Sequence, residues 1–442
     1  MDFKGSAVAR GARNGFDGGP PASNVGGKAP SPSWLSPLIS LAAINFFLGD
    51  VQGGLGPFLQ TWLAGAGGWS PARIGTVVTL VGLASLALNG PAGLLVDRLA
   101  RPRLLLCIGC AGLVGGSMLL LVVRSFIGVL AAEFLSAAGG TLVLPALTSL
   151  TLGIVGKDLF PQQQGRNQAF NHAGLVLSAV LVTWGAALLG GLAAFWVFGA
   201  MGAAAIAATV LMKGDVWNGR RAHGWNEAEE EDISHPTLRV IANRPLLLFA
   251  VALTGFNLAN GCMLGLLGQK LTEEMHVDAT FWVGLYVVTA QLMMIPVALG
   301  AGALADRRGR RHLLLVAFAA QIARGVLVAL IDDPAWLITT ELLDGIASGL
   351  LGVAIPVMVA DLTWGTGRTQ TAYGVVNTVQ GVGTAVSTLF GALLVGYFGW
   401  SWVFAVLAAP PALALLLGVW LEETAGSSSE PRSKAASISA RV

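Results

Sequence analysis

Four carboxylic acids lie inside long apolar stretches of this 442-residue sequence, where an ionised side chain is costly. They are Asp50, Glu133, Glu341 and Asp344. An acid in a low-dielectric environment keeps its proton more readily than one in water, and two neighbouring acids cannot easily both ionise. Side chains of this kind can bind and release protons, so these four are candidates for proton coupling.

Other polar residues in the same stretches could line a binding cavity. His172 could relay protons near the entrance of such a cavity, because its reference pKa lies near neutrality. A hydrogen-bonded packing role for His172 is the favoured interpretation. Asn257, Gln291 and Asn377 could contact a solute or bridge two helices.

Arg324 is the unusual cation of the apolar stretches. Two interpretations stay open. Its long side chain could extend toward the membrane surface, which is the favoured interpretation. Alternatively, it could pair with Glu341 or Asp344.

The composition identifies the class of protein. Hydrophobic residues make up 54% and charged residues 11% of the chain, and the mean hydropathy is +0.70, whereas soluble domains carry about 25% charged residues. A polytopic membrane protein fits these values. The net charge of +2 is too small to indicate a nucleic-acid partner. Cys107 and Cys110 form a Cys-x-x-Cys, but small buried residues explain them more simply than a metal site, so no metal or cofactor is expected.

Apolar runs of about 20 residues, each long enough to cross a bilayer, follow one another along the chain. We count twelve and predict an all-α membrane protein with two six-helix halves. The predicted helices cover residues 37–63, 72–96, 103–123, 126–155, 167–189, 193–212, 245–271, 281–305, 312–331, 336–362, 371–398 and 402–421.

The distribution of positive charge predicts the orientation. With both termini in the cytoplasm, 22 of the 26 Lys and Arg residues fall on the cytoplasmic side and three on the outer side. The inner or plasma membrane of a cell is the expected location. The predicted division is a disordered cytoplasmic tail (1–33), a first half (34–212), a cytoplasmic linker (213–244), a second half (245–421) and a cytoplasmic tail (422–442).

A repeated loop motif relates the two halves. Gly302, Asp306 and Arg310 follow Gly93, Asp97 and Arg101 by the same 209 positions. A glycine at a helix end permits close packing of a neighbouring helix, and the repeat indicates two homologous halves. The motif residues form two candidate gating loops: Gly93, Asp97, Arg98 and Arg101 in the first, and Gly302, Asp306, Arg307, Gly309 and Arg310 in the second.

The pattern Gly-x-x-x-Asp-Arg-x-Gly-Arg-Arg resembles the signature loop of the major facilitator superfamily, in a poorly characterised bacterial-type subgroup. The second copy matches in full, whereas the first has Ala100 and Pro102 at two positions. The resemblance implies that helices 1, 4, 7 and 10 line a central cavity, with Asp50 facing Glu133. It also implies that Asp97 and Asp306 interact with helix ends of the opposite half and control a conformational change.

Helices 5 and 11 supply a further resemblance. Gly165-Arg166 resembles the entry of helix 5 in the superfamily, and Gly367-Arg368 is expected to be its counterpart in helix 11.

The sequence therefore predicts a secondary active transporter that works by alternating access. Its partners would be a small-molecule substrate, protons and the lipid bilayer, and the protein would act as a monomer. A cationic, zwitterionic or neutral substrate is favoured over an anion, because no certain Lys or Arg faces the expected cavity. The alternatives are a sensor or scaffold that keeps the fold without transport, and a membrane enzyme. The enzyme is disfavoured because no metalloprotease or serine-hydrolase motif occurs.

Overall fold

A computed structural model describes residues 37–53, 62–63, 69–190, 192–212, 217–225, 242–277, 279–421 and 423–424. The secondary structure within these ranges is helical, without β-strands. In lipid every backbone polar group must be satisfied inside the protein, which a helix achieves within a single segment. The helices are α1 (Pro37–Gly53), α3 (Pro71–Leu99), α4 (Pro102–Leu119), α5 (Phe126–Leu189), α6 (Leu192–Val210), α7 (Gly219–Ala222), α9 (Arg244–Glu273), α10 (Ala279–Arg308), α11 (Arg310–Leu330), α12 (Pro334–Leu362), α13 (Thr369–Val406) and α14 (Ala409–Val419).

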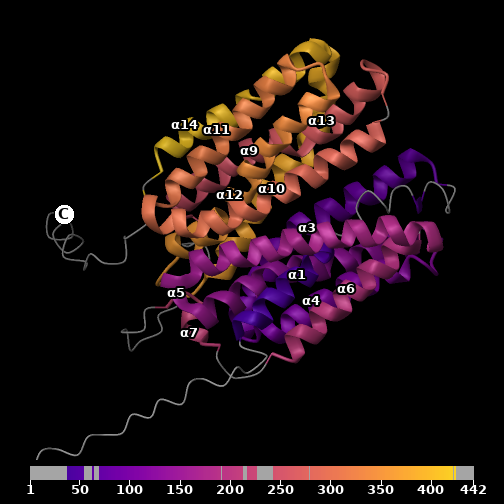
Figure 1. Cartoon of the computed structure of the whole chain (residues 1–442). Coiled ribbons are helices and arrows are strands. Elements are labelled where there is room, and N and C mark those ends of the chain that lie inside the picture. Colours follow the sequence, from indigo (N-terminus) through magenta and orange to yellow (C-terminus); the bar gives the residue numbers. More distant parts are fainter. Residues whose placement is uncertain are drawn as a thin grey trace, which may run out of the picture. The chain divides into compact units, whose positions relative to one another are not determined.

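These helices form two bundles (Figure 1). The first contains α1 and α3 to α6, and the second contains α9 to α14. A buried apolar cluster around Leu106 fills the first bundle, and clusters around Phe318 and Phe404 fill the second. The bundles meet mainly where α3 packs against α13 and where α10 packs against α5. The prediction of two helical halves is thus confirmed.

The described helices account for the predicted number of spans. Ten are long and apolar enough to cross a membrane, and one of these, in α5, is 60 residues long. It contains two spans because Gly156, with φ of 73°, breaks the helix between them. The apolar α1 supplies a further segment. Gly399, with φ of 68°, similarly separates the last two predicted spans.

The predicted start of the fifth helix, at residue 167, was wrong. The helix begins directly after Gly156, about ten residues earlier. Polar residues mark where the bilayer ends, but a helix can continue beyond that point into water. His172 consequently lies near the middle of its helical segment.

The two repeated loops share a left-handed residue, which explains the glycine in the motif. Gly309 has φ of 91°, and Ala100, at the matching position of the first loop, has φ of 50°. Alanine is disfavoured there because its Cβ approaches the following carbonyl oxygen. The two loops therefore share a positive φ at this position but not the same turn, because ψ is 34° at Ala100 and 160° at Gly309.

Candidate functional site

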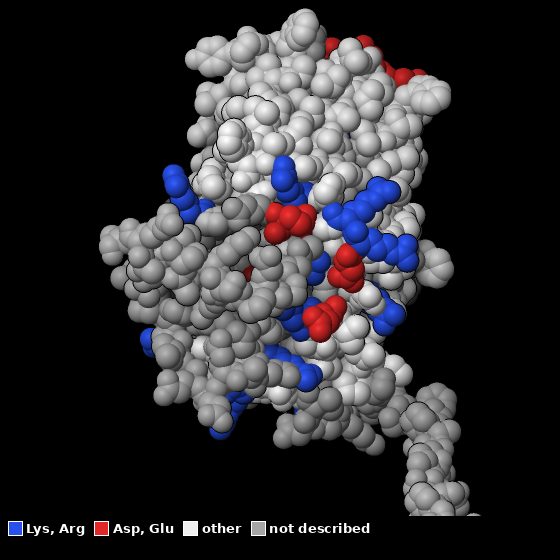
Figure 2. Space-filling model, turned by 90° about the vertical axis from the view of Figure 1, so that its left-hand side faces the viewer, with Lys and Arg blue, Asp and Glu red and all other residues white. Residues whose placement is uncertain are grey.

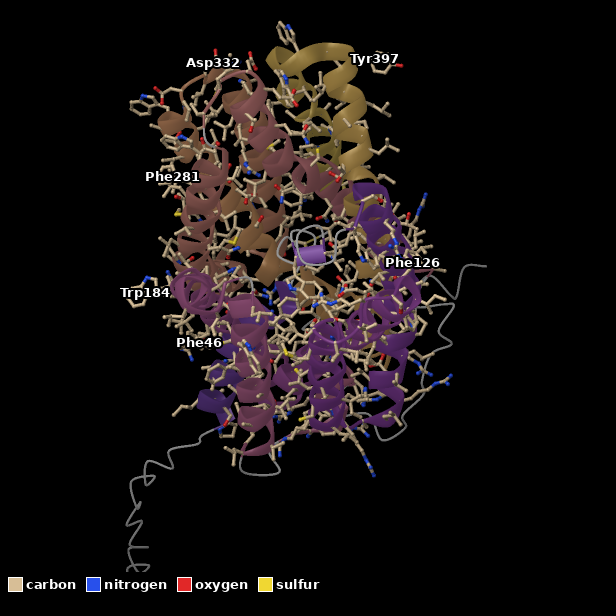
Figure 3. All side chains as sticks on the ribbon, turned by 90° about the vertical axis from the view of Figure 1, so that its right-hand side faces the viewer. Phe46, Phe126, Trp184, Phe281, Asp332 and Tyr397 are labelled. Carbon is tan, nitrogen blue, oxygen red and sulfur yellow. The ribbon has the colours of Figure 1, made fainter. Side chains whose placement is uncertain are left out.

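One face of the molecule holds α7 and both repeated loops, and we call it the linker face. The side where α3, α5, α10 and α12 begin is called the opposite face. Figure 2 shows the linker face, with Lys and Arg side chains placed around several Asp and Glu side chains. Figure 3 looks onto the opposite face, where Phe126, Asp332 and Tyr397 are labelled.

Near the linker face, α3 and α13 cross at two glycines. A Cβ on Gly93 would collide with the carbonyl oxygen of Gln370, and a Cβ on Gly374 would collide with that of Asn89. The backbones of the two helices are therefore in direct contact at these positions, which is possible only because both residues are glycine. The predicted role of Gly93 in close helix packing is confirmed.

The crossing of α10 with α5 repeats this geometry. A Cβ on Gly302 would lie 2.6 Å from the carbonyl oxygen of Pro161, and one on Gly165 would collide with Ala298. All four positions of this crossing differ by 209 from those of the first crossing. Gly165 therefore corresponds to Gly374, and the expected match between Gly165 and Gly367 was wrong by seven residues.

Asp97 binds the first turn of α13 with both carboxylate oxygens. It accepts hydrogen bonds from the backbone nitrogen and hydroxyl of Thr371, both at 2.7 Å, and from the Gln370 nitrogen at 3.2 Å. The Asp97 side chain is completely buried. A carboxylate at a helix N-terminus satisfies unpaired N–H groups and the positive end of the helix dipole. This contact joins the first bundle to the second.

Asp306 makes the corresponding contact more weakly. Its carboxylate accepts one hydrogen bond from the Gln162 side chain, at 3.3 Å, and lies 3.7 Å from Arg310. Its side chain is 29% exposed. The two gating aspartates predicted as equivalents therefore differ in burial and in the number of donors they bind. Arg98, Arg101 and Arg307, the remaining cations of the two loops, are exposed.

Asp361, at the linker-face end of α12, was not among the functional residues predicted from the sequence. Its carboxylate receives a hydrogen bond from Arg310 Nε at 3.0 Å and one from the Thr424 hydroxyl at 3.3 Å. Lys157 of the first bundle lies 3.7 Å away. An acid at the end of a span where positive charge prevails could have indicated such pairing.

A linker segment, residues 217–225, touches the first bundle. Trp217 donates its indole N–H to the Ser149 carbonyl at 3.1 Å, and the Asn218 backbone nitrogen bonds to Gly153 at 2.9 Å. His223 Nδ1 lies 3.3 Å from Asp97. The same aspartate that holds α13 thus also holds the linker segment.

The linker segment touches the second bundle as well. The His223 carbonyl accepts a hydrogen bond from the Thr369 hydroxyl at 3.2 Å, and the Ala222 carbonyl accepts one from Gln370 at 3.5 Å. Gly365 donates its backbone N–H to the Gly224 carbonyl. The linker segment therefore bridges both bundles beside the α3–α13 crossing.

Toward the opposite face, α3 and α13 separate. A cavity of about 780 Å³ lies between them, lined among others by Thr79, Gly82, Thr384 and Thr388. The two helices are thus in backbone contact near the linker face and apart near the opposite face.

Glu133 lines a second cavity, of about 290 Å³, between α3, α4 and α5. Ser85, Asn89, Ser136 and Thr141 are the polar residues beside it. Within the described residues the Glu133 carboxylate makes no hydrogen bond or ion pair. The backbone at Asp50 belongs to α1, but its side chain lies outside the described residues, so the expected Asp50–Glu133 pair stays a prediction.

The remaining polar candidates form two contacts within the long apolar helices. His172 Nδ1 lies 2.7 Å from Gln291 Oε1, which joins the two bundles. Gln380 donates to Asn377 at 2.7 Å and lies 3.5 Å from the Asn257 amide. The hydrogen-bonded role favoured for His172 agrees with this geometry.

Arg324 does not extend to the membrane surface, so that interpretation was wrong. It is buried between α9, α11 and α12, where its Nη2 donates to both oxygens of Glu341 at 2.9 Å. Its Nη1 donates to Asp344 Oδ1 and Asn260 Oδ1, each at 2.8 Å. Pairing prevails because the two acids lie one helical turn apart on the face of α12 that packs against α11. Among the described residues no group of three metal-ligating side chains occurs.

Comparison with known proteins agrees with this geometry. The sequence model of the Major Facilitator Superfamily, a protein family, matches residues 41–362 and 258–441 of this chain. An uncharacterised transporter of that superfamily from Mycobacterium tuberculosis strain H37Rv is 34% identical over 398 residues, which is 89% of this chain and 95% of the relative.

Two solved structures share the fold. FucP in its outward conformation has a TM-score of 0.68 at 14% identity, covering 88% of this chain and 99% of FucP. The proton:xylose symporter XylE has a TM-score of 0.69 at 12% identity, covering 88% of this chain and 97% of XylE. The repeated loops, the two bundles and the match over 89% of the chain together show that this chain is a multi-pass membrane transporter of the major facilitator superfamily.

Proposed function

We propose that the protein is a proton-coupled secondary active transporter of a small cationic, zwitterionic or neutral molecule. Alternating access is supported by the contrast between the two faces. Backbone contacts at Gly93 and Gly302 close the linker face, while a large cavity separates α3 from α13 toward the opposite face. Opening the linker face requires these contacts to break.

The linker face is proposed to be cytoplasmic, with both chain termini on the same side of an inner or plasma membrane. The 22 basic residues assigned to that side, against three on the other, support this orientation. The described outer cations are Arg73, Arg124 and Lys270. The cavity between α3 and α13 would then face outward.

The proposal of proton coupling rests mainly on Glu133. It is an acid within a span, it borders a cavity with four polar neighbours, and it has no ionic partner in the described part of the chain. Such a group favours its neutral, protonated form until water or a cation reaches it. Asp50 is the second candidate, on a helix that lines the cavity in the family fold. XylE provides a precedent for proton coupling on this fold.

The charges inside the spans support the proposed substrate class. Arg324 is the cation deepest in the described spans, and its guanidinium is occupied by Glu341 and Asp344. No cation remains there to hold a phosphate or dicarboxylate, whereas Glu133 remains available to a positively charged group. A sensor or scaffold would need neither a cavity nor an unpaired acid.

Transport by purified protein in proteoliposomes tests this proposal. Radiolabelled amines, amino acids and sugars, with a dicarboxylate for comparison, are offered with and without an imposed pH gradient. Glu133→Gln and Asp50→Asn mimic the protonated acids. At least one of them should abolish gradient-driven accumulation while exchange of substrate across the membrane continues.

Asp158→Asn is the matched control, because it makes the same change at an exposed acid, and it should accumulate substrate like the wild type. Gradient-driven accumulation by both test variants at the wild-type level would refute coupling through these acids. Failure of every solute to be transported would favour the sensor or scaffold.

A further inference from the structure

A groove on the second bundle is separate from the two cavities described above. It has a volume of about 580 Å³ and is formed by α9, α13 and α14 (Figure 1). Most of its lining residues are apolar, among them Val251, Leu258, Val382 and Leu413. All three helices belong to the same bundle, so the groove is not part of the space between the bundles.

The hydroxyl groups that line the groove are already hydrogen-bonded within the protein. The Thr254 hydroxyl donates to carbonyl oxygens of the protein and lies 3.0 Å from that of Val379. The Thr378 hydroxyl does the same and lies 2.9 Å from the carbonyl oxygen of Leu86 in α3. A polar solute would therefore find no free hydroxyl donor in the groove, which favours an apolar occupant.

The groove opens toward the hydrocarbon of the bilayer. Its lining residues Val251, Val382 and Leu413 are 50%, 47% and 63% exposed, and all three belong to predicted spans. Val251 lies seven residues from Arg244, which begins α9 at the linker face, a distance of about 10 Å along a helix. One leaflet of the hydrocarbon core is about 15 Å thick. Lipid acyl chains of the leaflet at the linker face can therefore reach the groove.

Each of the three lining helices has an arginine at its linker-face end. Arg244 begins α9, Arg368 directly precedes α13, and Arg311 Nη2 donates to the carbonyl of Val419, the last residue of α14, at 2.6 Å. Seven residues are almost two helical turns, so Arg244 lies on the same side of α9 as Val251.

These three arginines have unused capacity to bind an anion. Within the described residues none of their guanidinium groups forms an ion pair, and Nε of Arg311 and of Arg368 has no hydrogen-bond partner there. The nearby acid Glu423 accepts hydrogen bonds from the backbone nitrogens of Arg310 and Arg311, at 2.8 and 3.2 Å. An arginine binds phosphate oxygens with two parallel hydrogen bonds, and positive charge at the membrane surface attracts anionic lipids.

We propose that the groove binds one acyl chain of an anionic phospholipid, whose phosphate headgroup contacts Arg244, Arg311 and Arg368. The lipid belongs to the leaflet at the linker face, which is the cytoplasmic leaflet in the proposed orientation. Thr378 lines the groove and also bonds to α3. The bound chain therefore packs against the segment of α13 that contacts the first bundle. Lipid binding itself does not depend on the proposed transport activity.

Photo-crosslinking of the full-length protein in lipid nanodiscs tests the site. The nanodiscs contain phosphatidylcholine and a trace of phosphatidylglycerol that carries a diazirine in one acyl chain. Phosphatidylcholine with the same modified chain is the comparison. After illumination, mass spectrometry of peptides locates the attached lipid. We expect phosphatidylglycerol to label residues 251–258 and 410–417 several-fold more than phosphatidylcholine does.

Variants of the groove and of the arginines have matched controls. Leu413→Trp fills the groove and should reduce the labelling several-fold, whereas Leu416→Trp should not, because Leu416 is 61% exposed on the same helix but does not line the groove. Replacing Arg244 and Arg368 together with glutamine should lower labelling by phosphatidylglycerol to the level of phosphatidylcholine. Arg166→Gln, at an exposed arginine of the first bundle, should leave it unchanged.

Three results would overturn the assignment. Equal labelling of all exposed helices would mean that the groove holds no specific lipid. Equal labelling by the two lipids would refute the headgroup site. Unchanged labelling in Leu413→Trp and in a second filling variant, Val382→Trp, both folded and monodisperse, would place the lipid elsewhere. No transported solute is used, so lipid binding and the proposed transport function can fail separately.

Discussion

Replacing Asp97 with asparagine should shift the transporter toward a state that is open at the linker face. The carboxylate accepts three hydrogen bonds from the first turn of α13, two at 2.7 Å and one at 3.2 Å. Each hydrogen bond to a charged group contributes about 1.5–3 kcal/mol. Asparagine offers one acceptor oxygen and no charge, so it leaves at least one buried N–H or O–H unpaired.

The expected loss is about 3 kcal/mol for the whole set, because bonds that share one carboxylate are not additive. At about 1.4 kcal/mol per factor of ten, the equilibrium between closed and open linker face shifts about 100-fold. Spin labels on Leu104→Cys and Leu247→Cys, in a protein whose native cysteines have been replaced, report the distance between the bundles. Pulsed electron resonance then gives the population of each state.

Asp306→Asn is the matched control at the other loop. Its one donor is 3.3 Å away, and its ion pair is partly exposed, so the expected change is about 0.2–1 kcal/mol, or less than about tenfold. Equal shifts in the two variants would refute the argument that the buried Asp97 contact dominates. An unchanged distance distribution in Asp97→Asn would refute it as well.

Three further predictions concern the helix crossings, the first loop and the orientation. Gly302→Ala should favour the open linker face, because its Cβ would meet backbone atoms of Pro161, whereas Gly300→Ala, with nothing within 4 Å of its Cβ, should not; labelled distances distinguish them. Ala100→Gly should raise the stability of the purified protein by about 1 kcal/mol, measured by thermal unfolding, because φ of 50° suits glycine; no increase would mean that the turn is unstrained. Ser428→Cys in intact cells should resist an impermeant thiol reagent until the membrane is permeabilised, and labelling from outside would invert the orientation.

Close helix packing at Gly93 and Gly302 could be predicted from the sequence because it depends on a repeat. Gly93 and Gly302 are separated by the same interval as their aspartates, and a glycine at such a position has few uses other than close packing. The match between Gly165 and Gly374 was missed because the conspicuous Gly-Arg pair at residue 367 lies seven residues from the true counterpart. The similarity of the two Gly-Arg pairs indicated one alignment and the interval of 209 residues indicated another. The alignment from the interval agrees with the structure.

The partners of Arg324 could not be chosen from the sequence. A long cation in a span can satisfy its charge at the membrane surface or against an acid, and the choice depends on which side of α11 faces its own bundle. The identities of the partners of His223 and Asp361 were also inaccessible, since these partners lie in other segments of the chain. Periodicity describes one helix at a time, whereas these contacts arise from the packing of several.

The two helix crossings have a consequence for how such a transporter can diversify. Each crossing is formed by a glycine of one helix against a main-chain carbonyl of the other, so closure depends on the absence of side chains at four positions. The main chain is the same for every residue type. The side chains that select a solute can therefore change without altering these backbone contacts. The same closing contacts are compatible with many different solutes.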